Sequence, residues 1–274
     1  MLVVFSGGSG VGKNTIIEKL LQEGDFELLP TYTTREQRPN ESYGHPYYFI
    51  TEDEFKTKIE LNELFEYNVV HDHYYGTSRV LFENKTKSGK ILLKDIDVLG
   101  TQNLVETLGK LTTLLTIFLR VDSKDILVER LKGRNEQEID KRLERYEMEQ
   151  SYQSKYDFIV TNNSLEETMS VCYDIVYHVK NKSFLKSTQT IRNMNQDKIY
   201  KIAAVLKEDS EKIPPIDVCI KDHELYIIDG HHRYLASLLT GKKIAANIVV
   251  PKYFDEVTQY DWEDSIEFFS RGDI

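Results

Sequence analysis

Residues 2–21 decide the fold of the N-terminal part of the chain, and they read LVVFSGGSGVGKNTIIEKLL. The apolar run at 2–5 predicts a buried strand, and the mixture of apolar and charged residues at 16–21 predicts an amphipathic helix. Between them, residues 7–13 follow G-x-x-x-x-G-K, a pattern that carries meaning when a strand and a helix flank it in this order. Its glycines let successive N–H groups point inward at a polyphosphate, while the lysine and the helix N-terminus add positive charge. We therefore expect a site for a nucleoside triphosphate.

One position of this loop departs from the usual pattern. The residue after the lysine is normally Ser or Thr, whose hydroxyl ligates Mg²⁺, but here it is Asn14. An amide oxygen can ligate Mg²⁺ directly or through water, although it is bulkier and Mg²⁺ demands near-octahedral geometry. Two interpretations stay open: Asn14 is a tolerated substitute, or it weakens metal binding and slows turnover. The predicted ATP-binding residues of the loop are Gly7, Gly8, Ser9, Gly10, Val11, Gly12, Lys13, Asn14 and Thr15.

A second set of residues suits a nucleoside monophosphate. Arg35 and Arg38 lie three residues apart, with Tyr47 and Tyr75 downstream, and two guanidinium forks with two phenol donors match a phosphate dianion. Glu66 lies between two aromatic residues, and its carboxylate can accept hydrogen bonds from both N1–H and the exocyclic amine of guanine. Adenine lacks this pair of donors, so a buried carboxylate discriminates against it.

The segments 31–49, 65–67, 74–77 and 93–100 read TYTTREQRPNESYGHPYYF, FEY, YYGT and LKDIDVLG. In this order after the glycine-rich loop, they resemble the guanylate kinase family over about the first two-thirds of the chain. The resemblance implies an α/β P-loop kinase fold with a parallel sheet, a GMP-binding subdomain and a lid. It also implies contacts to the base from Thr31, Glu66, Thr77 and Asp97, and contacts to the GMP phosphate from Arg35, Arg38, Tyr47 and Tyr75.

The remaining kinase groups follow from a strand end and from the lid. Asp95 ends the run that starts at 91, where a P-loop kinase strand delivers a carboxylate to Mg²⁺, so Asn14 and Asp95 are the predicted metal ligands. Residues 125–143 resemble the family's lid, but the stretch between its second and third arginines is a few residues short, so we expect it to close differently. The resemblance implies that Arg130, Arg134 and Arg142 contact ATP. The predicted catalytic set of this part is Lys13, Arg35, Asp95, Arg130 and Arg142, with Mg²⁺ and ATP as cofactors.

Composition bounds the class of protein. The 274 residues are 40% hydrophobic and 29% charged, which predicts a globular chain long enough for two domains. A net charge of −10 argues against broad nucleic-acid binding but leaves nucleotides, whose sites concentrate positive charge locally. We expect a cytoplasmic protein without a membrane partner, because no apolar run approaches roughly 20 residues and only Cys172 and Cys219 are present.

The polar stretch 180–190 lacks a core-facing period and predicts a linker, so we expect domains at 1–181 and 187–274. After the linker, residues 213–220 read IPPIDVCI, 226–228 read YII and 229–233 read DGHHR before an apolar helix. This pattern resembles the ParB/sulfiredoxin superfamily and implies a small α+β domain. It is followed by a tail rich in acidic and aromatic residues, for which a docked amphipathic segment is the simpler interpretation.

A glycine, two imidazoles and an arginine at a helix N-terminus predict an anion site. We expect Asp229, Gly230, His231, His232 and Arg233 to form a second phosphate site, with Asp229 and His232 in a catalytic role and Asp229 also a possible base or metal ligand.

The motif is closest to that of free-serine kinases. Sulfiredoxin chemistry is excluded because His231 occupies the position that matches the nucleophilic cysteine. No sequence remains for the DNA-binding domain of the segregation proteins. The glutamate base of the serine kinases is missing from 187–196, so two hypotheses stay open: phosphotransfer to a small hydroxyl compound such as serine, or a nucleotide sensor. A further alternative makes the N-terminal domain a nucleotide-binding scaffold and gives the C-terminal domain the main activity.

Overall fold

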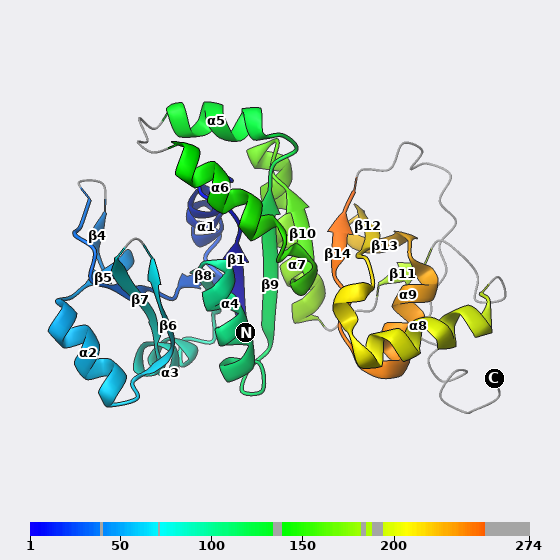
Figure 1. Cartoon of the computed structure of the whole chain (residues 1–274), viewed down its shortest axis with the longest axis horizontal. Helices are drawn as coiled ribbons and strands as arrows, with labels where there is room; N and C mark the ends of the chain where they lie inside the picture. Colours follow the sequence, from blue (N-terminus) through cyan, green and yellow to red (C-terminus); the bar gives the residue numbers. More distant parts are fainter. Residues whose placement is uncertain (39–40, 71, 134–138, 182–184, 188–193, 250–274) are drawn as a thin grey trace. The chain divides into compact units, whose positions relative to one another are not determined.

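The computed structural model describes residues 1–38, 41–70, 72–133, 139–181, 185–187 and 194–249 (Figure 1). The chain divides into two compact units, Met1–Thr116 and Ile117–Ile274, which we describe separately. Arg134, most of the predicted linker and the acidic-aromatic tail lie outside the described residues.

The first unit contains three parallel strands that carry the glycine-rich loop. Strand β1 (Leu2–Ser6) pairs with β8 (Ile91–Asp95), which pairs in turn with β2 (Phe26–Leu28). Every residue of β1 is buried, as the apolar run predicts. Helix α1 (Lys13–Leu21) follows β1 and buries Ile16, Ile17 and Leu20, so the expected strand–loop–helix unit is present.

A second sheet in the same unit is mixed rather than parallel. Its order is β4 (Ser42–Tyr43), β5 (Pro46–Phe49), β3 (Thr31–Thr33), β7 (His73–Ser78) and β6 (Leu64–Val70). Strand β3 is parallel to β5 but antiparallel to β7, and β6 and β7 are antiparallel. This sheet carries most of the residues that sequence predicts to bind GMP.

Helices α2 (Glu52–Glu60), α3 (Arg79–Thr86) and α4 (Val98–Leu108) complete the first unit. Each begins at a side-chain cap, which satisfies backbone N–H groups that have no partner within the helix. Helix α2 has a full capping box between Thr51 and Glu54, and α4 is capped by Asp97. A core cluster contains Leu2, Val4, Leu29, Phe65, Phe82, Leu92, Leu104 and Leu108.

The second unit continues strand β9 (Leu114–Arg120), which begins just before the boundary between the units. Parallel pairs join β9 to β10 (Phe158–Thr161), β10 to β14 (Ala246–Ile248) and β14 to β12 (Ile216–Lys221). Strand β12 forms an antiparallel pair with β13 (Glu224–Asp229), and β11 (Lys186–Ser187) lies at the edge. Strands β10 and β14, which pair with one another, therefore lie on opposite sides of the predicted linker in the sequence.

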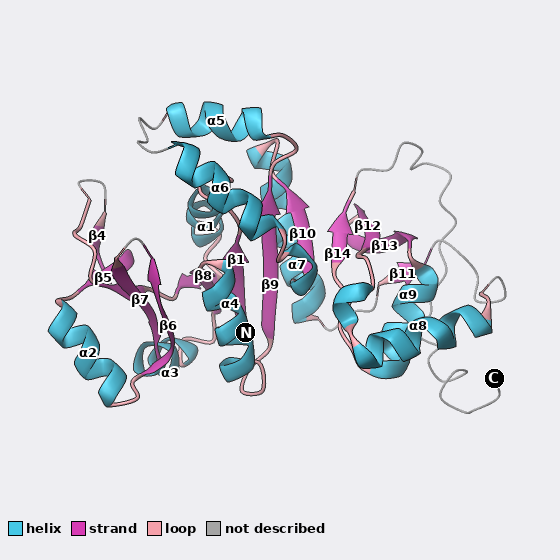
Figure 2. Ribbon diagram, viewed as in Figure 1, coloured by secondary structure: helices cyan, strands magenta, loops and turns pink. Residues whose placement is uncertain are grey.

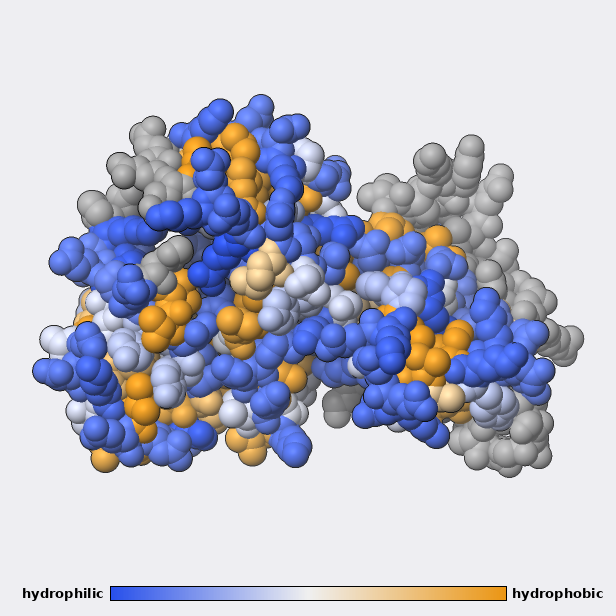
Figure 3. All heavy atoms as spheres, viewed as in Figure 1, coloured by the Kyte–Doolittle hydropathy of each residue, from blue (hydrophilic) through white to orange (hydrophobic). Residues whose placement is uncertain are grey.

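The helices of the second unit are interspersed among these strands along the chain (Figure 2). They are α5 (Lys124–Lys132), α6 (Ile139–Gln150), η1 (Gln153–Lys155), α7 (Leu165–Lys180), α8 (Gln196–Glu208), η3 (Ser210–Lys212) and α9 (His231–Thr240). Within the described ranges, no helix has both the length and the apolar character needed to cross a bilayer. The face drawn in Figure 3 is mostly hydrophilic, with separate apolar patches.

Candidate active site

The glycine-rich loop joins the end of β1 to the start of α1. Gly10 and Gly12 have φ angles of 87° and 103°, in the left-handed region that glycine adopts without steric cost. Gly12 is the N-cap of α1 and no side chain caps that helix. The first N–H groups of α1 therefore remain available to an anion, where the helix dipole also favours negative charge.

Lys13 holds its ammonium group over this loop. Its Nζ donates hydrogen bonds to the carbonyl oxygens of Gly7 (2.7 Å) and Gly8 (3.1 Å) and lies 3.9 Å from Oδ1 of Asp95. Burial raises the pKa of Asp95, while the ammonium groups of Lys13 and Lys94 oppose that shift. The loop carbonyls thus hold the cation at the position from which it can reach phosphate groups.

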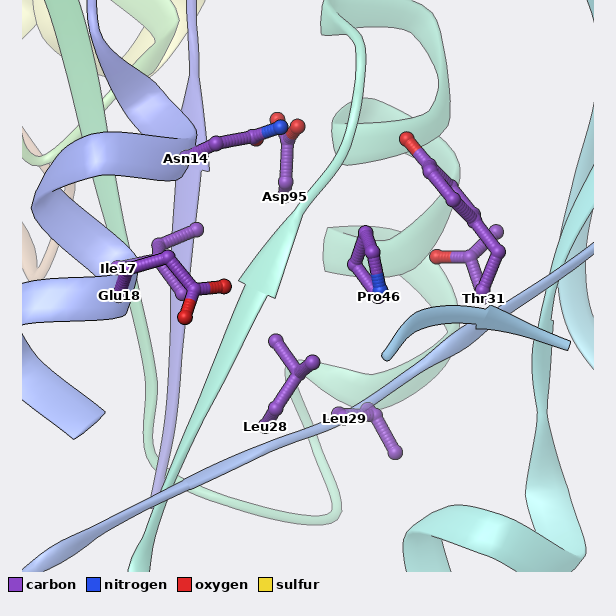
Figure 4. A pocket seen from close by; sticks show the side chains of 9 residues that line it. Asn14, Ile17, Glu18, Leu28, Leu29, Thr31, Pro46 and Asp95 are labelled. Atoms are coloured by element: carbon purple, nitrogen blue, oxygen red, sulfur yellow. The ribbon is translucent and has the colours of Figure 1, made fainter. Parts of the chain in front are cut away.

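Asn14 and Asp95 place two oxygen-bearing side chains at the donor end of the site. Figure 4 shows the two side chains pointing toward one another. Mg²⁺ commonly takes one or two protein oxygens and completes its shell with water and phosphate oxygens, so this pair fits such an ion. Among the described residues, no group of three or more His, Cys, Asp or Glu side chains forms a separate metal site.

The residues predicted to bind the acceptor phosphate include Arg35 and the tyrosines near it. Its Nη2 donates to both carboxylate oxygens of Glu41, at 2.7 and 2.9 Å, and its guanidinium lies over the ring of Tyr47, 5.2 Å from the centroid. Tyr75 contacts Tyr47 edge-on at 6.0 Å, and burial raises the pKa of Tyr47. The side chain of Arg38 is exposed, and its backbone N–H donates to Glu41 at 2.9 Å.

Glu41 is a residue whose role sequence reasoning missed. Its carboxylate occupies the fork of Arg35, and a carboxylate and a phosphate present similar oxygen pairs to a guanidinium. The one available signal was its spacing of three residues from Arg38, which alone does not distinguish a surface pair from a built site.

Glu66 and Thr77 face one another on neighbouring strands of the mixed sheet. Both side chains are buried, and the Thr77 hydroxyl donates a short hydrogen bond to Oε1 of Glu66. Burial raises the pKa of Glu66 to about 7, although the Lys94 ammonium opposes the shift. Asp97 caps α4 through Leu99 N and Gly100 N, at 2.8 and 2.9 Å.

Thr31 completes the predicted base site and receives a hydrogen bond from a lysine. Lys94 Nζ donates to Thr31 Oγ1 at 2.7 Å, and burial lowers the pKa of Lys94 to about 8. Sequence reasoning also missed this lysine, although a charge after the apolar residues 91–93 was a visible signal.

One pocket joins the two ends of the site. Asn14 and Asp95 from the donor end and Thr31, Pro46 and Tyr47 from the acceptor end line the same pocket (Figure 4). The remaining lining residues are Ile17, Glu18, Leu28 and Leu29. The structure therefore brings together predicted residues that lie up to 81 positions apart, from Asn14 to Asp95.

The predicted lid arginines belong to the second unit. Arg130 lies on α5, and its Nη2 donates to the carbonyl oxygen of Asn162 at 2.9 Å. Arg142 lies on α6 and is half-buried. Arg134 lies outside the described residues, so its predicted contact with ATP stays a prediction.

The second predicted phosphate site lies where β13 meets α9. Gly230 is the N-cap of α9 with φ 96°, so this N-cap resembles Gly12 of the glycine-rich loop in its backbone conformation. Its basic side chains are engaged within the chain. Arg233 donates to the carbonyls of Pro214 and Pro215 and to the Asp229 carboxylate.

The two histidines of this turn are also engaged within the chain, one by a hydrogen bond and one by burial. His232 Nε2 accepts a hydrogen bond from the Asn195 backbone N–H at 3.0 Å. His231 is buried, and desolvation lowers its pKa to about 4, so its imidazole is neutral near pH 7. The side chains predicted to bind phosphate at this turn therefore already have partners within the chain.

Comparisons with known proteins agree with the geometry of the first two-thirds of the chain. The family model described as guanylate kinase matches residues 1–179. The guanylate kinase of Fusobacterium nucleatum is 36% identical over 183 residues, which cover 66% of this chain and 96% of that protein. The guanylate kinase of Chlorobium chlorochromatii is 38% identical over 168 residues, covering 60% and 87%.

A solved structure gives the same result. The crystal structure of guanylate kinase from Anaplasma phagocytophilum matches with a TM-score of 0.54 and 27% identity, covering 65% of this chain and 85% of that one. The residues 1–179 matched by the family model contain the glycine-rich loop, the Arg35–Glu41 contact and the buried Glu66–Thr77 pair. The chain therefore belongs to the guanylate kinase family, and by enzyme class it is a nucleoside monophosphate kinase.

Proposed function

We propose that this protein transfers the γ-phosphoryl group of ATP to the phosphate of GMP, dGMP or a modified guanylate. The observation that carries this proposal is the shared pocket, which places Asn14 and Asp95 beside Thr31 and Tyr47. The buried Glu66 adds an acceptor for the guanine N1–H and amine. The names of the relatives support the same acceptor.

At the donor end, the loop from Gly7 to Thr15 binds the ATP phosphates through backbone N–H groups. Lys13 exchanges its contacts with the loop carbonyls for contacts with the transferred phosphoryl group. Asn14 and Asp95 hold Mg²⁺, which when bound neutralises phosphate charge. Positioning and charge neutralisation are the main contributions of a protein to this type of reaction.

At the acceptor end, the GMP phosphate replaces Glu41 in the fork of Arg35. Arg38, Tyr47 and Tyr75 provide further donors to that phosphate, and Thr31, Glu66, Thr77 and Asp97 contact the base. Arg130, Arg134 and Arg142 close over ATP from the lid segment. Displacement of Glu41 keeps the guanidinium paired both before and after substrate binds.

A coupled ADP-release assay with the full chain, ATP and Mg²⁺ tests this reaction across GMP, dGMP, IMP, AMP, CMP and UMP. We expect turnover of GMP and dGMP and weak or no turnover of AMP. Glu66→Gln serves as the matched control, because it keeps the shape but removes the paired acceptor for guanine. Folded protein that turns over no guanine nucleotide contradicts the proposal.

We also propose that residues 187–274 form a ParB/sulfiredoxin-like domain with a second phosphate or nucleotide site at Asp229, Gly230, His231, His232 and Arg233. The uncapped start of α9 supports an anion site. Burial raises the pKa of Cys219 to about 12, which argues against a thiolate mechanism in this region. Two versions remain: phosphotransfer to a small hydroxyl compound such as serine, with Asp229 and His232 acting on the substrate, or a nucleotide sensor.

Titration of ATP, ADP and CTP into the full chain carrying Lys13→Met separates these versions, because that substitution weakens the first nucleotide site. His232→Ala in the same background is the control. Binding without phosphorylation of serine supports the sensor, and phosphorylation of serine supports a second kinase site. If the Lys13→Met chain instead phosphorylates serine and unsubstituted protein leaves GMP untouched, the first domain is a scaffold. Absence of any binding contradicts both versions.

A further inference from the structure

Lys94 is a fully buried lysine on β8, next to Asp95 in the sequence. Lysine is rarely fully buried unless its charge is paired, because removing an ammonium group from water is costly. Its neighbours on the same face of the strand are apolar, and Leu92 belongs to the core cluster. A leucine or methionine would fill such a position without the desolvation cost of an ammonium group. The presence of a lysine here therefore needs an explanation, which its contacts provide.

The hydrogen bond of Lys94 leads to the predicted base site, and so does the largest attraction on its charge. Lys94 Nζ donates to Thr31 Oγ1 at 2.7 Å, and the charges that act on it most strongly after burial are those of Glu66 and Asp95. No carboxylate oxygen of the described residues lies within ion-pair distance of Lys94. The lysine is thus connected to Thr31 by a hydrogen bond and to Glu66 by longer-range attraction.

The direction of this hydrogen bond is fixed by chemistry. An ammonium group has three donors and no acceptor, so Thr31 Oγ1 must accept, and its own hydroxyl hydrogen must point to a different acceptor. Thr77 has the opposite arrangement, because it donates to Glu66 and keeps only lone pairs for other partners. The site therefore offers a donor at Thr31 and acceptors at Glu66 and Thr77.

We propose that Lys94 is a positioning residue that occupies a lone pair of Thr31 Oγ1, turns the Thr31 hydroxyl hydrogen toward the base and thereby favours a purine with a 6-carbonyl oxygen. This inference rests on the proposed phosphorylation of a guanylate. Guanine presents O6 as an acceptor beside N1–H and the 2-amine, which matches this pattern of donor and acceptors. A 6-amino purine presents a donor to Thr31 instead, and a buried mismatch of that kind is strongly disfavoured.

Three acceptors separate the contribution of position 6 from that of position 2. GMP carries the 6-carbonyl and the 2-amine, IMP lacks only the 2-amine, and 2,6-diaminopurine riboside monophosphate carries a 6-amine with the 2-amine retained. The experiment measures kcat/KM for the three compounds with unsubstituted protein, Lys94→Met, Thr31→Val and the double variant. Lys90→Met, an exposed change just before β8, is the control for loss of a lysine.

We expect Lys94→Met to lower the preference for GMP over the diaminopurine nucleotide by roughly tenfold or more. The preference for GMP over IMP, which depends on Glu66, stays within about twofold, because any effect of the lost charge on the ATP side is the same for all three acceptors. Thr31→Val shows the same loss, and the double variant shows no additional loss, since both changes act on one hydroxyl. A lysine that served only packing would not shift one ratio and leave the other.

An unchanged preference in Lys94→Met overturns the proposal, as does an equal change in both ratios. If Lys94→Met does not fold, Thr31→Val decides: retention of the GMP preference in that variant also overturns it. Calorimetric binding of the same nucleotides covers the case in which the protein turns over none of them. Selective GMP binding that depends on Lys94 then supports the inference even though the proposed reaction fails.

Discussion

The loop between β1 and α1 and the turn between β13 and α9 differ in length, but each ends in a glycine N-cap with nearly the same backbone angles. Gly12 and Gly230, their N-cap residues, have φ/ψ angles of 103°/12° and 96°/20°, and neither helix has a side-chain cap. Six other helices begin instead at a capping side chain, contributed by Thr51, Ser78, Asp97, Ser123, Ser164 and Asn195. Among the α-helices whose N-cap the structure describes, these two begin without a side-chain cap and so leave N–H groups available to an anion.

The side chains around these two helix starts differ. Lys13 is held by neutral carbonyl oxygens and lies 3.9 Å from Asp95. Its ammonium group can therefore exchange these carbonyl partners for a phosphate at little cost in free energy. Arg233 is bound by the Asp229 carboxylate and two carbonyl oxygens. A glycine N-cap therefore does not by itself give the two turns equal affinity for phosphate. The neighbouring cation must also be able to leave its partners within the protein.

The strongest test of this difference is Lys13→Met in the full chain. We expect kcat/KM for GMP phosphorylation to fall by about 10²–10³-fold, because an aligned charge at the transferred group is lost. The coupled ADP-release assay measures it, with Lys19→Met on the same helix as the control. Arg233→Met, by contrast, leaves this rate within about twofold. A similar loss in both variants would remove the distinction between the two turns.

Gly230→Ala tests the backbone requirement of the second turn. An added Cβ would lie 2.5 Å from Ile216 Cγ2 in a left-handed conformation, so we expect the free energy of unfolding to fall by roughly 2–4 kcal/mol. Gly241→Ala is the matched control, since its φ is also positive but nothing lies within 4 Å, and about 1 kcal/mol is expected. Urea denaturation measures both; equal losses would show that the contact with Ile216 is relieved cheaply.

We also expect the GMP site and the turn at Gly230 to respond differently to pH, because Glu66 and His231 have different pKa values. Glu66 has a pKa raised to about 7, and its protonated form loses an acceptor for guanine, so the KM for GMP should rise up to about tenfold as pH falls from 8 to 6. Lys94, Asp97 and Thr77 act on the same carboxyl group. His231, with a pKa lowered to about 4, stays neutral over this range. Steady-state kinetics measure the KM for GMP against pH, with Glu66→Gln as the control, because titration of the GMP phosphate affects both proteins equally. If the two pH profiles are parallel, the pH dependence of KM does not come from Glu66.

The smallest expected effect concerns Asn14, the predicted metal ligand of the first turn. Asn14→Ser replaces the bulkier amide by the hydroxyl usual at this position, and we expect a rate increase of about two- to fivefold at limiting Mg²⁺. The increase disappears at saturating Mg²⁺ if metal binding is the cause. An unchanged or lower rate at limiting Mg²⁺ shows that Asn14 is not a defect in metal binding.

Sequence alone determined the parts of the site that lie in short contiguous motifs. Residues 2–21 contain a buried strand, a glycine turn and a helix in succession, so local conformation is sufficient to build the loop from Gly7 to Thr15. The resemblance to guanylate kinases likewise placed Thr31, Glu66 and Thr77, and the structure brings these residues to one mixed sheet.

Only the tertiary structure decided which side chains these residues meet. Lys94 contacts Thr31 across 63 positions of sequence, and Glu41 fills the fork of Arg35. Strand β14 pairs with β10, which joins the C-terminal segment to the kinase part of the chain across the predicted linker. Periodicity specifies which face of a strand is buried, but it does not specify which strands are neighbours, and partners of buried polar groups depend on that order.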